Sequence, residues 1–312
     1  MKLRYLAAAP LVAAAMLGTT AAAWPATPAA VPPPPPALTA SALSARYTAD
    51  AKAVTTAGQN AARDGNKQLA SALATLSKGH VLFFNPNGAG VAAMVIGNLA
   101  TANRVAILVP GADTTLATFF SRGPDSPGGG AQALAREARK LEPEDAGERL
   151  AIIAWLGYPT PALLSPAVMT SGDAGQGARA LRPLVTALAG HGDQVALLCH
   201  SYGSVVCGLA APHLPVTDIA VFGSPGLDAN SVAALHTRAR VWAGRESGDS
   251  IMYVPHIHLL GLGFGADPMS NGFGARVFAT GDSGHSGYLD PGSASLRNLT
   301  DIALGNTAAV TR

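Results

Sequence analysis

The second half of the chain alternates short apolar runs with segments whose apolar residues recur at helical spacing. The apolar runs predict strands at residues 150–155, 194–198, 218–222, 240–243 and 277–279. The segments between and after them predict helices near 177–189, at 203–211, near 229–237 and around 296–302, the last ended by Gly305. Because parallel strands are joined by crossover helices, this alternation predicts an α/β fold with a mostly parallel central sheet and helices on both faces.

The first half carries the same two signals in a different order. Helical spacing from residue 41 to 77 predicts one or two covering helices, with Gly58 and Gly65 indicating a break. Apolar runs at 81–84 and 105–109 predict further strands, whereas the run at 91–96 fits either a strand or a helix. A chain of 312 residues fits one large domain, which we assign to residues 41–312.

The first 40 residues differ in composition from the rest. Lys2 and Arg4 precede an apolar stretch at 5–17, and small residues end at Ala23, which predicts a cleaved signal peptide over residues 1–23. Residues 24–40 contain five consecutive prolines and predict an extended linker. An uncleaved membrane anchor is the alternative, although the apolar stretch is short for a span. We expect an exported protein, secreted or held at the cell surface.

Composition narrows the possible partners. The chain is 48% apolar and 13% charged, which allows a substantial core. Its net charge of +2 is spread without a run of Lys and Arg, so we expect no nucleic-acid partner, while contact with a membrane stays open. Cys199 and Cys207 are the only cysteines. Export would permit a disulfide, but we expect two small buried thiols instead.

The turn between the strand at 194–198 and the helix at 203–211 carries the strongest chemical signal. Residues 199–204 read Cys-His-Ser-Tyr-Gly-Ser. A serine in a sharp strand-to-helix turn, with small residues two positions away on each side, forms a nucleophile elbow. Gly203 meets that requirement, and Cys199 stands where glycine is usual. The alternative is an ordinary serine at the N-cap of a helix.

An acid and a histidine follow Ser201 in the order that this arrangement requires. Asp249 follows the strand at 240–243, and His285 follows the strand at 277–279. We expect His285 to take the proton of Ser201 as general base, and Asp249 to orient the imidazole. The alternative acids are Asp228, which follows the preceding strand and ranks next, Glu246 and Asp267.

An ester carbonyl that becomes negative in the transition state needs preorganised N–H donors, which form an oxyanion hole. The backbone N–H of Tyr202 is one expected donor. The second is expected from the loop after the strand at 105–109, where we choose the N–H of Ala112. We expect Asp113 to cap a helix that starts near Thr114.

Other candidate features receive weaker interpretations. His256 and His258 form a His-x-His pair without a third ligand at suitable spacing, so we expect no metal and no cofactor. His200 is expected to face away from the reaction as a packed, hydrogen-bonded side chain. The segments at 158–169 and 259–265 are candidates for a wall or lid of an acyl pocket, and the second fits a buried loop at least as well.

Several segments together resemble one family, the actinobacterial α/β hydrolases long catalogued as a domain of unknown function. They lie at residues 97–100, 108–111, 155–158, 200–204, 265–268 and 285–288, and the similarity covers about residues 41–306. The resemblance implies the α/β-hydrolase fold and a Ser/Asp/His triad, which falls on Ser201, Asp249 and His285. Cys199 departs from the glycine typical of the family.

These features predict a secreted serine hydrolase that cleaves a carboxylic ester through an acyl-enzyme. We expect a small-molecule ester or acyl substrate. Transfer of the acyl group to another alcohol shares every intermediate until the second step, and is one alternative. A non-catalytic binding protein that kept the fold is the other, and it predicts no covalent labelling of Ser201 by a serine-directed probe.

Overall fold

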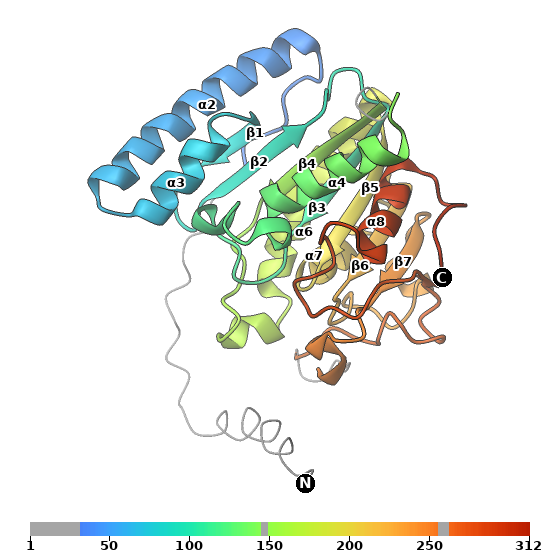
Figure 1. The fold of residues 1–312 in the computed structure, drawn as a ribbon. Coiled ribbons are helices and arrows are strands. Elements are labelled where there is room, and N and C mark those ends of the chain that lie inside the picture. The colour runs from blue at the N-terminus through green and yellow to red at the C-terminus, as the bar shows by residue number, and fades with distance from the viewer. Residues whose placement is uncertain (1–31, 145–148, 255–261) are drawn as a thin grey trace, which may run out of the picture.

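The computed structural model describes residues 32–144, 149–254 and 262–312. Eight strands form one sheet in the order β1-β2-β4-β3-β5-β6-β7-β8 (Figure 1). β2 pairs antiparallel with both β1 and β4, and all other neighbouring strands pair in parallel. The predicted α/β fold with a mostly parallel sheet is therefore confirmed.

The strands lie on the apolar runs of the sequence, except that β8 is short and exposed and shares only Val277 with the run predicted at 277–279. They are β1 (His80–Asn85), β2 (Val91–Ile96), β3 (Arg104–Val109), β4 (Leu150–Leu156), β5 (Gln194–His200), β6 (Asp218–Phe222), β7 (Arg240–Gly244) and β8 (Arg276–Val277). The run at 91–96 is a strand, and it pairs on both sides. β4 is buried along its whole length, as expected for a strand in a sheet that is covered on both faces.

Helices cover both faces of the sheet (Figure 1). They are α2 (Ala40–Arg63), α3 (Lys67–Leu76), α4 (Pro127–Leu141), α6 (Gly172–His191), α7 (Gly203–Ala210) and α8 (Ala294–Leu304). Side chains of α6 and α7, such as Leu181 and Val206, pack into one apolar core, whereas Leu134 of α4 and Leu299 of α8 belong to a second core. Each face of the sheet thus has its own covering layer, as predicted.

The predicted break in the N-terminal helical segment falls at one of the two glycines. Gly65 lies between α2 and α3 with φ +76°, in the left-handed region that glycine adopts without strain. Gly58 lies inside α2 and serves close packing instead, because a Cβ there would stand 3.3 Å from Leu73 Cβ of α3. The two helices pack against each other, and α2 also packs against β1.

One predicted helix is wrong. Residues near 229–237 form a loop that contains only a short 3-10 turn, Ala233–Leu235. The backbone of this loop pairs across to a later segment, with the Val232 N–H bonded to the Phe273 carbonyl and a bridge from Ala229 to Gly265. These backbone bonds take the place of the hydrogen bonds that a helix would form there.

No helix within the described residues is long and apolar enough to cross a membrane.

Candidate active site

Ser201 stands in a sharp turn between β5 and α7. Its φ is +51°, a conformation that is uncommon for a residue other than glycine, and its N–H donates to the Phe222 carbonyl at 3.0 Å. Gly203 makes the tight turn possible, because a Cβ there would lie 2.6 Å from the Val109 carbonyl oxygen. The strand, the strained serine and the helix form the elbow that the sequence predicts.

A continuous chain of hydrogen bonds joins the three residues of the predicted triad. Ser201 Oγ lies 2.8 Å from His285 Nε2. On the other side of the ring, His285 Nδ1 lies 2.9 Å from each carboxylate oxygen of Asp249. Because a carboxylate accepts only, Nδ1 carries the proton, which leaves Nε2 free to accept from the serine hydroxyl. The structure brings the three residues together, and their catalytic roles remain predictions.

Asp249 is fully buried, and several hydrogen-bond donors stabilise its charged carboxylate. Besides His285, the Ile251 N–H donates to Oδ1 at 2.8 Å and the Tyr288 hydroxyl donates to Oδ2 at 2.6 Å. Burial raises the pKa of the Asp249 carboxyl, but the bonds from His285, Tyr288 and Ile251 outweigh it and lower the pKa below its usual value. The carboxylate therefore stays charged at neutral pH.

The alternative acids have other partners in the structure. Glu246 Oε2 accepts from the Gly281 and Ser283 N–H groups, and Oε1 accepts from the Ser295 hydroxyl. Glu246 thereby ties the loop that carries His285 to β7. The carboxylate of Asp267 forms an ion pair with Arg245 at 3.0 Å. Among the described acids, Asp249 is the one hydrogen-bonded to the His285 ring.

Tyr288 is a site residue to which the sequence analysis assigned no role. Its hydroxyl donates to Asp249 and accepts from the Glu246 N–H at 3.0 Å, and the side chain is buried. Its position three residues after His285, within one of the segments that carry the family resemblance, was the available signal. The Tyr288 hydroxyl thus holds one carboxylate oxygen of Asp249, while the Ile251 N–H holds the other.

The loop after β3 brings candidate oxyanion donors beside the serine. Gly111 packs so closely that a Cβ there would lie 2.7 Å from Ser201 Cβ. The Tyr158 hydroxyl donates to the Pro110 carbonyl at 2.8 Å and fixes the start of this loop. Within the described chain, the N–H groups of Ala112 and Tyr202 form no hydrogen bond with protein atoms. Two unused donors near the elbow fit the predicted oxyanion hole.

The side chains of Asp113 and Tyr202, close to the serine in the chain or in its loop, are each hydrogen-bonded to the backbone of another segment. The predicted helix cap at Asp113 is wrong, because its Oδ1 accepts from the Leu163 N–H at 3.0 Å and its φ is +55°. The next helical turn, Leu116–Thr118, is capped by Thr115 instead. The side chain of Tyr202 points away from the serine, since its hydroxyl donates to the Thr170 carbonyl at 2.6 Å.

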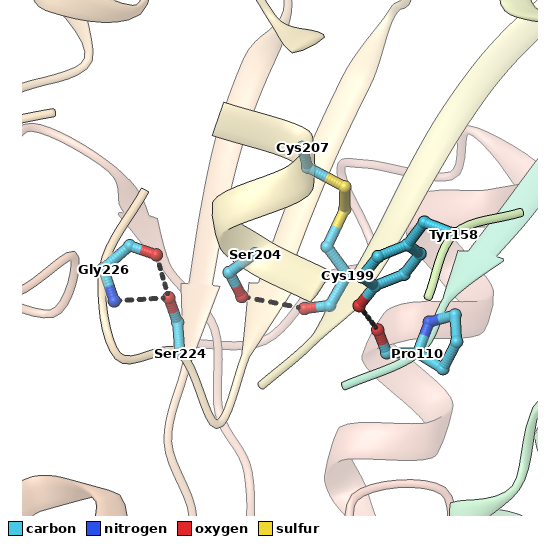
Figure 2. The surroundings of a disulfide bond; sticks show 7 residues. All are labelled: Pro110, Tyr158, Cys199, Ser204, Cys207, Ser224 and Gly226. Atoms are coloured by element: carbon cyan, nitrogen blue, oxygen red, sulfur yellow. Dashed lines mark hydrogen bonds between the residues drawn. A yellow bond between two sulfur atoms is a disulfide. The ribbon is translucent and has the colours of Figure 1, made fainter. Parts of the chain in front are cut away.

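The expectation of two free thiols is wrong. Cys199 and Cys207 form a disulfide between the end of β5 and the first turns of α7 (Figure 2). The elbow reverses the chain, so residues eight apart in sequence have Cα atoms 6.5 Å apart, within the range for a disulfide. Figure 2 also shows the hydrogen bond from the Ser204 hydroxyl to the Cys199 carbonyl. Its donor–acceptor distance is 3.2 Å. The cysteine at the usual glycine position is thus one half of a crosslink across the elbow.

His200 is packed and hydrogen-bonded, as predicted. Its Nε2 lies 2.9 Å from the His285 carbonyl, and its ring stacks on Phe222. Burial, together with the nearby His285, lowers the pKa of His200 to about 3, so the ring is neutral at physiological pH. The two imidazole centroids are 4.9 Å apart. Because His200 is neutral, it places no positive charge next to the His285 ring.

The segments considered as walls or lids divide into buried and exposed parts. Tyr158 and Phe264 are buried and pack around the Tyr202 ring. Leu163 and Leu164 project into solvent. Residues 259–261, and the pair His256 and His258, lie outside the described residues. Within the described residues, no cluster of three His, Cys, Asp or Glu side chains is arranged to hold a metal ion.

A mostly parallel eight-stranded sheet that carries a serine after β5, an acid after β7 and a histidine after β8 defines the class of protein. The family model described as "Alpha/beta hydrolase" matches residues 85–259. The chain belongs to the α/β hydrolase family. The matched range includes Ser201 and Asp249 and ends before His285.

Two mycobacterial relatives share much of this chain. They are the proteins described as uncharacterized protein Rv2079 and uncharacterized protein MT2140, from the H37Rv and CDC 1551 strains of Mycobacterium tuberculosis. Each is 32% identical over 256 residues, covering 72% of this chain. The matched part is 38% of each relative, so the chain spans well under half of their length.

Solved structures of similar architecture include XC6422 from Xanthomonas campestris, described as an α/β serine hydrolase without a lid. It is 13% identical with a TM-score of 0.41, over 72% of this chain and 92% of that chain. Esterase PE8 is 17% identical with a TM-score of 0.43, over 69% of this chain and 98% of that chain. The activities in these descriptions belong to those proteins.

Proposed function

We propose that the protein is a serine hydrolase that cleaves carboxylic esters through an acyl-enzyme on Ser201. The observation that carries the proposal is the hydrogen-bond chain from Asp249 through His285 to Ser201 Oγ. A serine hydroxyl is a weak nucleophile at neutral pH and needs an adjacent base, and the base needs a group that fixes its tautomer. His285 lies at hydrogen-bonding distance from Ser201 and is the base, and Asp249 lies at hydrogen-bonding distance from His285 and fixes its tautomer.

In the proposed reaction, Ser201 Oγ attacks the ester carbonyl carbon while its proton passes to His285 Nε2. The N–H groups of Ala112 and Tyr202 stabilise the oxyanion of the tetrahedral intermediate. The bond to the leaving alcohol then breaks, and His285 returns the proton to the alcohol oxygen. Water attacks the acyl-enzyme with His285 again as base, which releases the acid and restores Ser201.

The surroundings of His285 support this role. The ring becomes a cation in both transition states, and the charged Asp249 carboxylate stabilises that cation. His200, the adjacent imidazole, stays neutral at neutral pH and does not repel the cation. Asp249 therefore favours the protonated form of His285, and His200 does not oppose it.

The proposal includes export from the cytoplasm, by way of the signal peptide predicted at residues 1–23. The disulfide between Cys199 and Cys207 supports it, because disulfides persist mainly in oxidising compartments outside the cytosol. We place the chain within the actinobacterial group of the family on the basis of the sequence segments described above.

A fluorophosphonate probe tests the proposal on the purified protein, with the labelled peptide located by mass spectrometry. We expect labelling at Ser201 that is lost in Ser201→Ala and His285→Ala. Ser204→Ala is the matched control, because Ser204 lies in the same turn but its hydroxyl bonds the Cys199 carbonyl. A folded protein that is not labelled is a binding protein rather than a hydrolase. Competing alcohols added to the ester assay separate hydrolysis from acyl transfer.

A further inference from the structure

One side of the candidate triad opens into a wide, open hollow of about 650 Å³ beside His285. The hollow is lined by charged side chains and by the loop that carries the histidine: Arg122, Asp125, Asp290 and residues 283–287. Because His285 returns its proton to the leaving alcohol, the alcohol part of an ester lies on the histidine side. The hollow is therefore where the leaving group of the proposed reaction is placed.

The oxyanion loop is tied to an exposed apolar tip. Asp113 accepts from the Leu163 N–H at 3.0 Å, and the Asp113 N–H donates to the Pro161 carbonyl at 3.0 Å. Thr160 Oγ1 adds two more bonds, to the N–H and the carbonyl of Thr114. These four bonds hold the loop after β4 next to the loop that carries Ala112.

The tip of that loop carries Leu163 and Leu164, which are 61% and 99% exposed. A second apolar pair, Met252 and Tyr253, follows Asp249 and is also exposed. The first pair follows the carboxyl end of β4 and the second that of β7, and these ends share an edge of the sheet with the carboxyl end of β5 (Figure 1). Ser201 directly follows β5. Exposed large apolar side chains on loops at the edge of the sheet that carries the site indicate a surface that meets an apolar ligand.

Charged side chains line the hollow beside His285, whereas exposed apolar side chains lie near the oxyanion loop. From this contrast we infer that the substrate is an amphiphilic ester, in which an apolar acyl chain is joined to a polar, hydroxyl-bearing alcohol. The acyl chain lies against Leu163 and Leu164 beside the oxyanion loop. The alcohol lies in the hollow with Arg122, Asp125 and Asp290, whose charged groups bond hydroxyls. The inference rests on the proposed ester hydrolysis, and it names the substrate class of that same site.

The test compares four soluble esters below the concentration at which they form micelles: acetylglycerol, octanoylglycerol, and the methyl esters of the same two acids. We expect the native protein to have the highest kcat/KM for octanoylglycerol. Leu164→Ser lowers the ratio of the octanoylglycerol value to the acetylglycerol value roughly five- to tenfold, because the apolar contact is made only by the long chain. Leu164→Met keeps the preference, since it restores an apolar surface at the same position.

Arg122→Ala tests the proposed binding of the alcohol part of the ester in the hollow. We expect it to lower the ratio of kcat/KM for each glycerol ester to kcat/KM for the matching methyl ester by about three- to tenfold. Equal hydrolysis of acetyl and octanoyl esters, or equal loss on glycerol and methyl esters in Arg122→Ala, overturns the substrate class while the esterase proposal stands. Failure to hydrolyse any ester overturns the proposed function itself, and the inference with it.

Discussion

The Tyr288 hydroxyl donates a hydrogen bond of 2.6 Å to Asp249 Oδ2, the oxygen that also lies 2.9 Å from His285 Nδ1. The acid that orients the histidine is therefore itself oriented by a buried phenol. The same hydroxyl accepts from the Glu246 N–H, so Tyr288 connects the end of β7 with the loop that carries His285. This connection makes Tyr288 a positioning residue for the proposed reaction.

Tyr288→Phe is expected to lower kcat about three- to tenfold with little change in KM, because the hydroxyl bonds Asp249 rather than the ester. The pKa of Asp249 should rise, since the bond from Tyr288 lowers it. Tyr47→Phe is the control, because the Tyr47 hydroxyl has no hydrogen-bond partner within the described residues. Steady-state kinetics of both variants check this. Equal kinetics in the two variants would show that Tyr288 has no positioning role.

Asp249→Asn is expected to lower kcat by about three to four powers of ten, because an amide favours the wrong imidazole tautomer. Asp228→Asn, the change at the next-ranked acid, should leave kcat within about twofold; Asp228 has φ +56°, a conformation that asparagine tolerates. Ester kinetics on both variants decide between the two acids. A large loss in Asp228→Asn with a small one in Asp249→Asn would reassign the acid.

Gly223 is expected to be essential to the geometry of the site. Its φ is +57°, and an added Cβ would stand 3.1 Å from His285 Cε1 and 3.2 Å from Asp249 Oδ2. Gly223→Ala should therefore lower kcat roughly tenfold or more, and stability by about 1 kcal/mol or more. Gly65→Ala carries the same backbone cost at φ +76° with no atom within 4 Å of the Cβ, so it should lose stability but keep kcat. Kinetics and urea unfolding measure the two effects separately.

The disulfide is expected to contribute stability more than catalysis. Replacing both Cys199 and Cys207 by alanine should lower the free energy of unfolding by about 2–3 kcal/mol, the amount expected for a short crosslinked loop. Activity of the folded variant should stay within a few-fold of the native value, because the Ser201 N–H is still held by the Phe222 carbonyl. Both cysteines are buried, so a thiol reductant should act only on unfolded protein. An unchanged urea midpoint would contradict this prediction.

We expect the folded protein to lose stability in acid because His200 is packed in its neutral form. Its pKa falls from the ordinary 6.5 to about 3 on folding, so the unfolded chain binds the proton more readily between these values. The stabilising contribution is complete above pH 6.5 and is lost as the pH falls toward 3. We expect about 2 kcal/mol of that loss between pH 6.5 and 4.5. His200→Gln should flatten the urea stability profile in that window, and an identical slope in both proteins would argue against it.

The sequence by itself determined most of the strands and most of the covering helices, although it left the run at 91–96 open and did not predict α4. Apolar runs such as 150–155 and 194–198 became strands because they can be buried on both faces, and the order of Ser201, Asp249 and His285 follows from which strand each one follows. These features depend on local pattern and on chain order. Both are visible without coordinates.

Tertiary structure decided the features that depend on distance between segments. Residues near 229–237 have a helical pattern, yet they form a loop because their backbone pairs with residues 264–273. Cys199 and Cys207 form a disulfide because the elbow brings the end of β5 next to α7. Asp113 accepts a hydrogen bond from the loop after β4 instead of capping a helix. Tyr288 reaches Asp249 across 39 positions in the chain. Such contacts follow from the path of the chain in space, because hydrogen bonds and disulfides need proximity that residue type alone does not specify.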